Sequence, residues 1–291
     1  MGNDPWDPSM LSHEEEKYIL QQAYVPEHIP ALMVGISGGE AFLRDGFVFY
    51  TQPPWMIFIG YPLSFPFQEN QTVRALEKAM ETFHPQETWF IGPTIPEAFA
   101  SSAREMEQDE YFRLDLRGYD LPKELKRAVQ KGQSGLSIER SRRYSSDHAD
   151  LTQEFLERGE PPPRIRELFR RMDRYIAHSS TSLLVSARTP EGRLSAFYVL
   201  ELAAENFSTY VVGAYSKKHY VPHASDLLFY DMVCLSQESR KSYIHLGLGV
   251  NDGIRRFKKK WGGVPFLSYR SCKIAKRSPS LLDWLFGFGN R

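Results

Sequence analysis

The sequence predicts an α+β protein whose mixed, mainly antiparallel sheets are flanked by helices. Short runs rich in Val, Ile, Phe and Tyr alternate with longer segments whose apolar residues repeat at helical spacing. Gly and Pro pairs separate these segments, which is typical of turns. The 291 residues are enough for two domains, and we expect an N-terminal domain over residues 1–120 and a C-terminal domain over residues 121–291.

The first half is rich in extended segments. The expected elements are a helix at 13–24, extended runs at 31–37, 41–52 and 55–61, a helix at 73–83, and strands at 88–91 and 111–116. The helix at 73–83 is predicted because Val73, Leu76 and Phe83 lie on one face. This order of strands, helix and strand suggests a degenerate copy of the fold of the second half.

The second half alternates helices and strands. The expected elements are helices at 121–131, 151–158 and 165–177, strands at 183–186, 194–202 and 207–215, a helix at 225–238, a strand at 243–246 and a final basic helix. Ser225 is a candidate N-cap for its helix, and Asp226 complements the helix dipole in the first turn. A generic α+β sandwich with the same elements is the alternative.

The most informative segment is YIHLGLGVNDGIRRFKKKWGG, residues 243–263. An apolar strand runs into a glycine-rich turn at Gly247, Gly249 and Gly253, and a basic helix follows. A glycine turn that opens a helix exposes N–H groups and the positive helix end to an anion. The lysines could equally be a solvated face. No Gly-Lys-Ser/Thr follows the glycines, and their spacing does not fit a dinucleotide fingerprint.

The runs HASDLLFYDMV, YIHLGLG and GIRRFKKKWGGVPFLSY resemble the C-terminal half of the GCN5-related N-acyltransferase (GNAT) superfamily. They are closest to the branch that contains the Fem-type aminoacyl transferases. The pairs that follow the order of that branch are Ala224-Ser225, Leu246-Gly247, Phe257-Lys258 and Trp261-Gly262. The resemblance implies tandem GNAT-like domains and an acyl or aminoacyl transfer reaction.

The resemblance also implies where an acyl donor would bind. The residues expected to hold its phosphate-bearing part are Ser225, Gly247, Gly249, Asn251, Gly253, Lys258 and Trp261. A backbone N–H of the strand at 209–214 would polarise the donor carbonyl. One departure is that the superfamily's usual acetyl-CoA loop is absent before Ser225, so acyl-CoA, acyl-carrier protein and aminoacyl-tRNA all stay open as donors.

Transfer to an amine also needs a proton acceptor. We take His223, His245 and Glu201 as the candidate catalytic residues, because imidazole and carboxylate groups accept protons. A histidine on a strand can equally be an ordinary core or rim residue. No metal-binding spacing of His, Cys or carboxylate residues is found, so no metal is expected.

Composition limits the class of protein. The 36 basic and 36 acidic residues balance, so any anion site must be local and DNA binding is not expected. Two cysteines and the lack of an N-terminal signal pattern favour the cytoplasm. No segment is long enough to be an integral membrane span, but the apolar tail at 281–291 is a candidate for docking on the domain, on a partner or on a membrane surface.

We therefore expect an N-acyltransferase that moves an acyl or aminoacyl group from a phosphate-bearing carrier to an amine of a small molecule or peptide. Acyl-CoA, acyl-carrier protein or aminoacyl-tRNA would be a co-substrate, and no bound prosthetic group is expected. The alternative is a non-catalytic carrier- or tRNA-binding protein that retains the fold.

Overall fold

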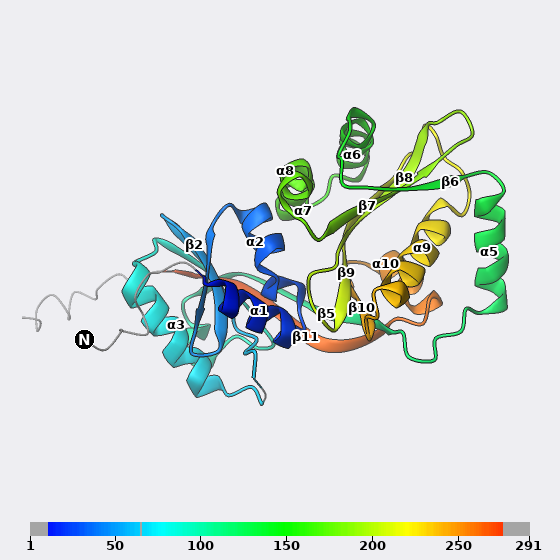
Figure 1. Cartoon of the computed structure of the whole chain (residues 1–291). Coiled ribbons are helices and arrows are strands. Elements are labelled where there is room, and N and C mark those ends of the chain that lie inside the picture. The colour runs from blue at the N-terminus through cyan, green and yellow to red at the C-terminus, as the bar shows by residue number, and fades with distance from the viewer. Residues whose placement is uncertain (1–10, 65, 276–291) are drawn as a thin grey trace, which may run out of the picture. The chain divides into compact units, whose positions relative to one another are not determined.

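The computed structural model describes residues 11–64 and 66–275, so the apolar tail at 281–291 lies outside the described residues. The described chain forms two compact units (Figure 1). Unit 1 contains Gly39–Asp109 and residues 268–275, and unit 2 contains Leu11–Gly38 and Glu110–Leu267. The units are therefore interleaved along the chain, whereas the expected division at residue 120 follows chain order.

Unit 1 contains a mixed part of the 11-stranded sheet and one long helix. In order across the sheet its strands are β1 (Glu40–Arg44), β2 (Phe47–Gln52), β3 (Trp55–Ile59), β4 (Glu87–Gly92) and β11 (Val264–Ala275). Only the β3–β4 pair is parallel. Helix α3 (Glu69–Phe83) connects β3 to β4, and the short helix α4 (Glu97–Ala100) follows β4. Asp45 and Gly46 both have positive φ, which suits the tight β1–β2 hairpin.

The core of unit 1 is aromatic. Phe49 lies 6.1 Å from Phe58, and Phe58 lies 6.4 Å from Phe90, measured between ring centroids in stacked arrangements. Leu76 and Ala79 of α3 pack in the same core cluster, as the apolar face of that helix predicted.

Unit 2 contains the other strands of the 11-stranded sheet. In order across it the strands are β5 (Ala103–Asp115), β10 (Tyr243–Leu248), β9 (Phe207–Tyr215), β8 (Leu194–Glu201), β7 (Ser182–Arg188) and β6 (Ser137–Ser141). The β9–β10 pair is parallel, and the other neighbouring pairs are antiparallel. Residues 110–115 of β5 belong to this unit and pair with β10.

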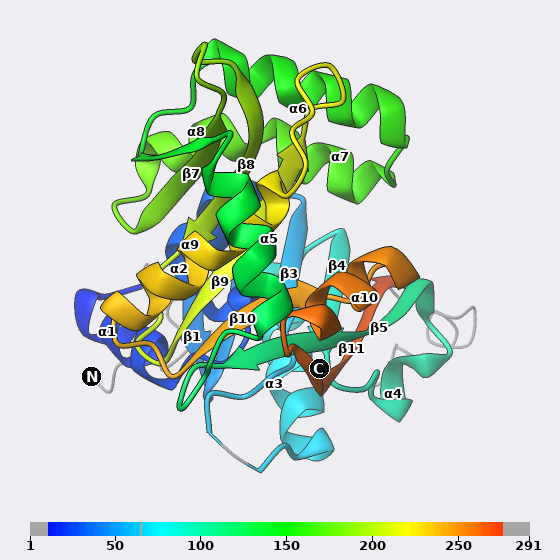
Figure 2. The same ribbon diagram turned by 90° about the vertical axis from the view of Figure 1, so that its right-hand side faces the viewer.

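Helices cover both faces of the unit 2 sheet. They are α1 (His13–Gln22), the 3-10 turn η1 (Pro26–His28), α2 (Pro30–Ser37), α5 (Lys123–Gln133), α6 (Ser146–Gly159), α7 (Pro163–Arg170), α8 (Met172–His178), α9 (Ala224–Glu238) and α10 (Asp252–Lys260). Helices α5 and α9 lie side by side on one face, while α6 and α8 lie on the other (Figures 1 and 2). Each face therefore has its own apolar core.

Three local expectations were wrong. Residues 31–37 form helix α2 rather than a strand: Pro30 starts the helix, Gly38 ends it at φ 81°, and Gly35 allows the ring of Tyr175 to approach closely. The helix expected at 165–177 is broken at Arg171, whose ψ is −1° and whose guanidinium donates to the Ser37 carbonyl.

The N-cap of α9 also differs from the expectation. His223, in the left-handed region at φ 67°, is the N-cap, and the helix already includes Ser225. The Ser225 carbonyl accepts a hydrogen bond from the Tyr198 hydroxyl at 3.3 Å. The left-handed conformation of His223, and not the capping preference of serine, therefore determines that the helix begins at Ala224.

Candidate functional site

The parallel strands β9 and β10 separate part-way along their length. They pair at Phe207–Tyr243, Ser208–Ile244 and Thr209–His245, and within the described residues no pairing joins them further on. Beyond this point β9 pairs with β8 and β10 pairs with β5. We call the gap between the two strands after Thr209 and His245 the strand opening. It lies beside the strand at 209–214, whose backbone N–H is the expected partner of the donor carbonyl.

Both strands carry an irregularity at the level of the opening. The β10–β5 register shifts between His245 and Gly247, and the β9–β8 register shifts opposite Val199 and Leu200. Such bulges bend a strand and increase its twist. Gly247 has φ +72°, and a Cβ built on it would lie 4.0 Å from the Tyr210 carbonyl oxygen of β9. Glycine at this position therefore both permits the bend and keeps the opening clear.

The glycine-rich turn after β10 is held by its own hydrogen bonds. Gly249 donates its N–H to the Glu110 carbonyl at 3.1 Å, and Asn251 is the N-cap of α10, where its side chain accepts from the Ile254 N–H at 3.0 Å. A Cβ on Gly253 would lie 3.3 Å from the Asn251 side-chain oxygen. Asn251 thus already satisfies one of the N–H groups that were expected to face an anion.

Lys258 does not lie on the solvated face of its helix. It is 6% exposed, and its ammonium donates to the Leu248 carbonyl at the end of β10 and lies 5.5 Å from the centre of the Phe112 ring. Its neighbour Lys259 is exposed. A buried cation beside the last residue of β10 brings positive charge to the strand opening, where a low dielectric strengthens its effect.

His245 is fully buried at the start of the opening. Gly247 donates its N–H to Nδ1 at 3.1 Å, so Nδ1 acts as an acceptor and the proton of the neutral ring sits on Nε2. Burial, assisted by the charge of Lys258, lowers the pKa of His245 well below its usual value. Nε2 has no hydrogen-bond partner among the described residues. The ring is therefore a neutral donor with one N–H to offer.

Two residues on this side of unit 2, Tyr111 beside His245 and Glu27 near Tyr111, were not predicted. The Tyr111 ring of β5 lies 4.8 Å from the His245 ring. Burial raises the pKa of Glu27 in η1, and a hydrogen bond from Tyr111 and the charge of Arg164 partly oppose this shift. Glu27 is far from Tyr111 and His245 in the sequence, and no motif contains it. A buried carboxyl group whose pKa lies above its usual range is a functional-site signal that only the structure reveals.

Glu201 lies in a closed network at the end of β8. It is fully buried and accepts hydrogen bonds from the Tyr175 hydroxyl, from Ser179 Oγ at 3.2 Å and from the N–H groups of Leu202 and Ala203 at 2.8 Å. Four donors stabilise the carboxylate and fix the β8–β9 turn. Glu201 pairs with Thr209 near the start of β9, whereas Tyr215 lies at the opposite end of that strand.

The remaining predicted residues gather at the amino end of α9. His223 Nδ1 lies 3.2 Å from Asp226, and Lys260 and the Trp261 indole both donate to the same carboxylate at 2.7 and 3.3 Å. Trp261 is fully buried and packs against Phe229 in the core. The structure therefore brings His223, Asp226 and Trp261 together as one cluster and places His245, Gly247 and Lys258 in another.

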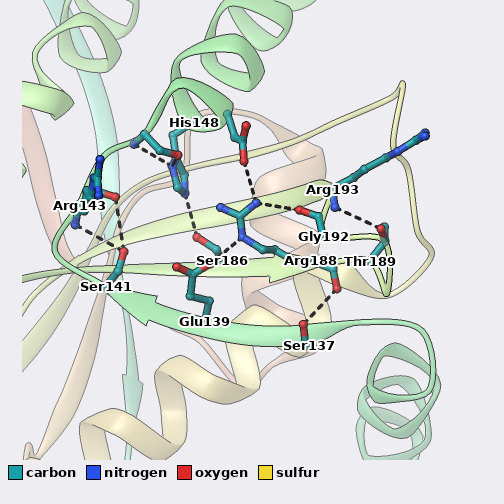
Figure 3. A network of polar contacts seen from close by, with 12 residues as sticks. Ser137, Glu139, Ser141, Arg143, His148, Ser186, Arg188, Thr189, Gly192 and Arg193 are labelled. Atoms are coloured by element: carbon teal, nitrogen blue, oxygen red, sulfur yellow. Dashed lines mark hydrogen bonds and ion pairs between the residues drawn. The ribbon is translucent and has the colours of Figure 1, made fainter.

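A third polar network lies on β6, β7 and α6 (Figure 3). His148 Nδ1 accepts from the Ser145 N–H at 3.2 Å, so its Nε2 donates to Ser186 Oγ at 2.9 Å. Burial and the charge of Arg188 lower the pKa of His148 to about 4. His148 cannot remove the Ser186 proton in this tautomer, so the pair is not a nucleophile and its base.

Arg188 connects the elements around that network. Its guanidinium donates to Glu139 at 2.6 Å, to Asp147 at 2.8 Å and to the Gly192 carbonyl at 3.0 Å (Figure 3). This links strand β6, helix α6 and the β7–β8 turn. The arrangement is a structural brace for the edge of the sheet.

The described residues limit other kinds of site. Among residues 11–64 and 66–275, no three His, Cys, Asp or Glu side chains are grouped so that they could hold a metal ion. No helix in this part of the chain is long and apolar enough to cross a membrane. A hollow of about 670 Å³ lies near the end of β5 and is lined by Asp115, Arg117, Arg240 and Lys241, but Lys241 there already donates to two backbone carbonyls.

Solved structures with a similar fold are found across nearly the whole chain. FemX matches at 13% identity with a TM-score of 0.59, covering 96% of this chain and 99% of its own. A tandem GNAT protein from the clavulanic acid biosynthesis pathway matches at 13% identity with a TM-score of 0.57, covering 94% of this chain and 98% of its own. The chain has the GNAT fold.

A third similar structure is L-PGS from Bacillus licheniformis, with 14% identity, a TM-score of 0.57, and coverage of 97% of this chain and 99% of its own. No protein-family model and no curated protein matches the sequence. The fold that the sequence resemblance indicated is thus confirmed. At these identities the likeness describes the fold and not the reaction.

Proposed function

We propose that the protein is an N-acyltransferase that moves an acyl or aminoacyl group from a phosphate-bearing carrier to an amine. The observation that carries this proposal is the strand opening, with a buried cation from Lys258 and a buried N–H from His245 at its base. Acyl transfer requires a place where a carbonyl oxygen can gain negative charge. Fixed donors around such a place supply the largest share of many rate enhancements.

In the proposed reaction the donor carbonyl enters the opening beside Gly247. The acceptor nitrogen attacks the carbonyl carbon, the new C–N bond forms, and negative charge develops on the oxygen near Lys258 and His245 Nε2. Collapse of this intermediate breaks the bond to the carrier. His245 is a hydrogen-bond donor in this scheme and not the base, because its free nitrogen already carries a proton.

The amine must lose a proton during the reaction, and we propose that Glu27 accepts it. Its raised pKa makes it a stronger base than an ordinary glutamate, and Tyr111 connects it to His245. Glu201 is a weaker candidate, since four hydrogen bonds occupy its carboxylate. His223 is a weaker candidate because it lies with Asp226 in the other cluster.

We also propose that the two units are tandem copies of one fold. Each has antiparallel strands, a helix, a strand parallel to the last one, and an antiparallel strand beside that. The similarity to a tandem GNAT protein supports this proposal. An acyl-CoA, an acyl-carrier protein or an aminoacyl-tRNA would be the co-substrate, and the cytoplasm the place of action.

The test is a transfer assay with labelled acyl-CoA, acyl-carrier protein and aminoacyl-tRNA donors and a mixture of small amines and peptides, analysed by mass spectrometry. Lys258→Met should lower the transfer rate by about 100- to 1,000-fold, the effect of removing one donor from an oxyanion site. The matched variant Lys259→Met should behave as the wild type, because Lys259 is exposed. Equal rates in both variants would remove Lys258 from the site. Tight carrier binding without any transfer would favour the non-catalytic alternative.

A further inference from the structure

Two large aromatic side chains stand exposed where β9 ends and the loop to α9 begins. Tyr215 is 41% exposed and Tyr220 is 60% exposed, and their ring centroids are 6.3 Å apart at an angle of 67°. The rings therefore do not cover each other face to face. Exposed tyrosines that are paired in this way are unusual, because a folded chain gains free energy by burying such rings.

The loop that carries these rings is held by hydrogen bonds to helix α6. The carboxylate of Glu154 in α6 accepts from Ser216 Oγ at 2.8 Å and from the Lys217 N–H, and Ser216 Oγ in turn accepts from the His219 N–H at 2.9 Å. The guanidinium of Arg158 stacks 4.5 Å from the centre of the Tyr215 ring. The loop backbone and the Tyr215 ring are thus held in place before any ligand arrives, which lowers the entropy lost on binding.

The same loop is positively charged. Lys217 and Lys218 are exposed, while Arg158 pairs with Glu154 at 3.5 Å. The surface therefore combines aromatic rings with two lysines that have no acidic side chain within ion-pair distance among the described residues. Aromatic faces beside cations are the pattern that binds single-stranded nucleic acid, because bases stack on the rings and phosphates contact the cations.

From this geometry we infer a nucleotide-binding subsite for single-stranded RNA, in which Tyr215 and Tyr220 stack a base and Lys217 and Lys218 contact phosphates. The inference deepens the proposed function and rests on it for the role of the strand opening. Tyr215 is four residues beyond Val211, or about 13 Å along β9. A few nucleotides of an extended strand span this distance, so an RNA-borne acyl group could reach the opening.

The amino end of α9 argues for RNA over the adenosine diphosphate of an acyl-CoA. Residues 214–246 contain no glycine, and Pro222 has no N–H. The Asp226 carboxylate, 9% exposed, already lies in the first turn of α9. A diphosphate at this helix end would meet negative charge and few free N–H groups. Phosphates spread along a strand can instead be met by lysine side chains.

The first experiment measures binding of a fluorescein-labelled single-stranded RNA of about 12 nucleotides by fluorescence anisotropy. Tyr220→Ala should weaken binding about 5- to 150-fold, since stacking a base on an aromatic ring is worth about 1–3 kcal/mol. Tyr220→Phe should bind within about twofold of the wild type, because the ring remains. Tyr18→Ala in α1 is the matched control, since Tyr18 is 43% exposed. Equal affinities of Tyr220→Ala and Tyr18→Ala would overturn the inference.

The second experiment measures the salt dependence. Replacing both Lys217 and Lys218 by Ala should reduce the slope of log affinity against log salt by about 1.4, or about 0.7 for each phosphate contact. The control pair Lys123→Ala and Lys126→Ala in α5 should leave the slope unchanged. An unchanged slope in the loop variant would contradict the phosphate contacts.

Two further arms separate the ligands and the proposals. Displacement of the RNA by coenzyme A, lost in Tyr220→Ala, would assign the subsite to a coenzyme and overturn the RNA inference. Lys258→Met should keep the RNA affinity of the wild type. If Tyr220→Ala does not affect RNA binding while transfer from some donor persists, only the RNA inference fails. If RNA binding depends on Tyr220 but no donor is used, only the transferase proposal fails.

Discussion

The parallel strand pairs of the two units differ at one point. In unit 1, β3 and β4 stay paired from Trp55–Glu87 to Ile59–Ile91, and the Gly60 N–H then donates to the Ile91 carbonyl at 2.6 Å. In unit 2, β9 and β10 stop pairing at Thr209–His245. The same order of elements therefore produces a closed seam in one unit and an opening in the other.

Side chains maintain this difference. The ring of Phe90 fills the seam of unit 1, since a Cβ on Gly60 would lie 2.3 Å from it. At the corresponding place in unit 2, Gly247 faces the Tyr210 carbonyl across 4.0 Å, and bulges bend both strands. The parallel seams of the two units thus differ through a few residues.

The largest expected effect tests whether the chemistry belongs to unit 2. Glu27→Gln keeps the size and polarity of the side chain but cannot accept a proton, so the transfer rate should fall by about 100-fold or more. In the wild type the rate should rise with pH as Glu27, whose pKa is raised, loses its proton. This rise should be absent from the pH–rate profile of the variant. Rates are measured under single-turnover conditions. Glu81→Gln on α3 of unit 1 is the control, and a similar loss there would contradict the comparison.

Acid should loosen unit 2 before unit 1. His148 is neutral in the folded protein with a pKa of about 4, against 6.5 in the unfolded chain. The unfolded chain therefore binds the proton more readily than the folded protein does. The contribution of neutral His148 to the stability of the fold is complete above pH 6.5 and is lost as the pH falls toward 4. The loss amounts to at most about 3 kcal/mol.

Hydrogen exchange, corrected for the intrinsic effect of pH, can follow this loss in α6 and β7. The protection of α3 in unit 1 should change little over the same range. His148→Asn should flatten the pH dependence of α6 and β7. Parallel losses of protection in both units would show that the histidine is not the cause.

Two glycine variants should both lower stability, but only the variant at the strand opening should also lower activity. Gly60→Ala should destabilise unit 1 by about 1–3 kcal/mol, because the methyl group overpacks against Phe90. The folded variant should retain the transfer rate of the wild type. Gly247→Ala should cost about 1–2 kcal/mol, since φ is positive, and should also lower kcat/KM. Chemical denaturation and transfer assays measure the two quantities. Loss of activity in Gly60→Ala at a temperature where it is folded would oppose the comparison.

Local patterns predicted much of the fold. Helix α3 and strand β9 follow from spacing. The motif also indicated Gly247 and Lys258, whose roles at the candidate site stay predictions. Tyr111 and Glu27 were not predicted, because only long-range packing brings Tyr111 to His245 and Glu27 to Tyr111. Two long-range strand pairings were also not predicted: β5 pairs with β10, and β11 pairs with β4. No local sequence pattern identifies either partner.

The smallest expected effect concerns His223, and His245 serves as its contrast. His223 lies beside Asp226 at the amino end of α9, and Asp226 also accepts hydrogen bonds from Lys260 and Trp261. His223→Gln should therefore change the transfer rate less than about threefold, well below a general-base contribution. His245→Leu removes the buried N–H at the strand opening and should lower the rate by about 100-fold, as the loss of an oxyanion donor does. The two rates, measured with one donor and one amine, rank the clusters directly. A large loss in His223→Gln together with a normal rate in His245→Leu would move the reaction from the strand opening to the amino end of α9.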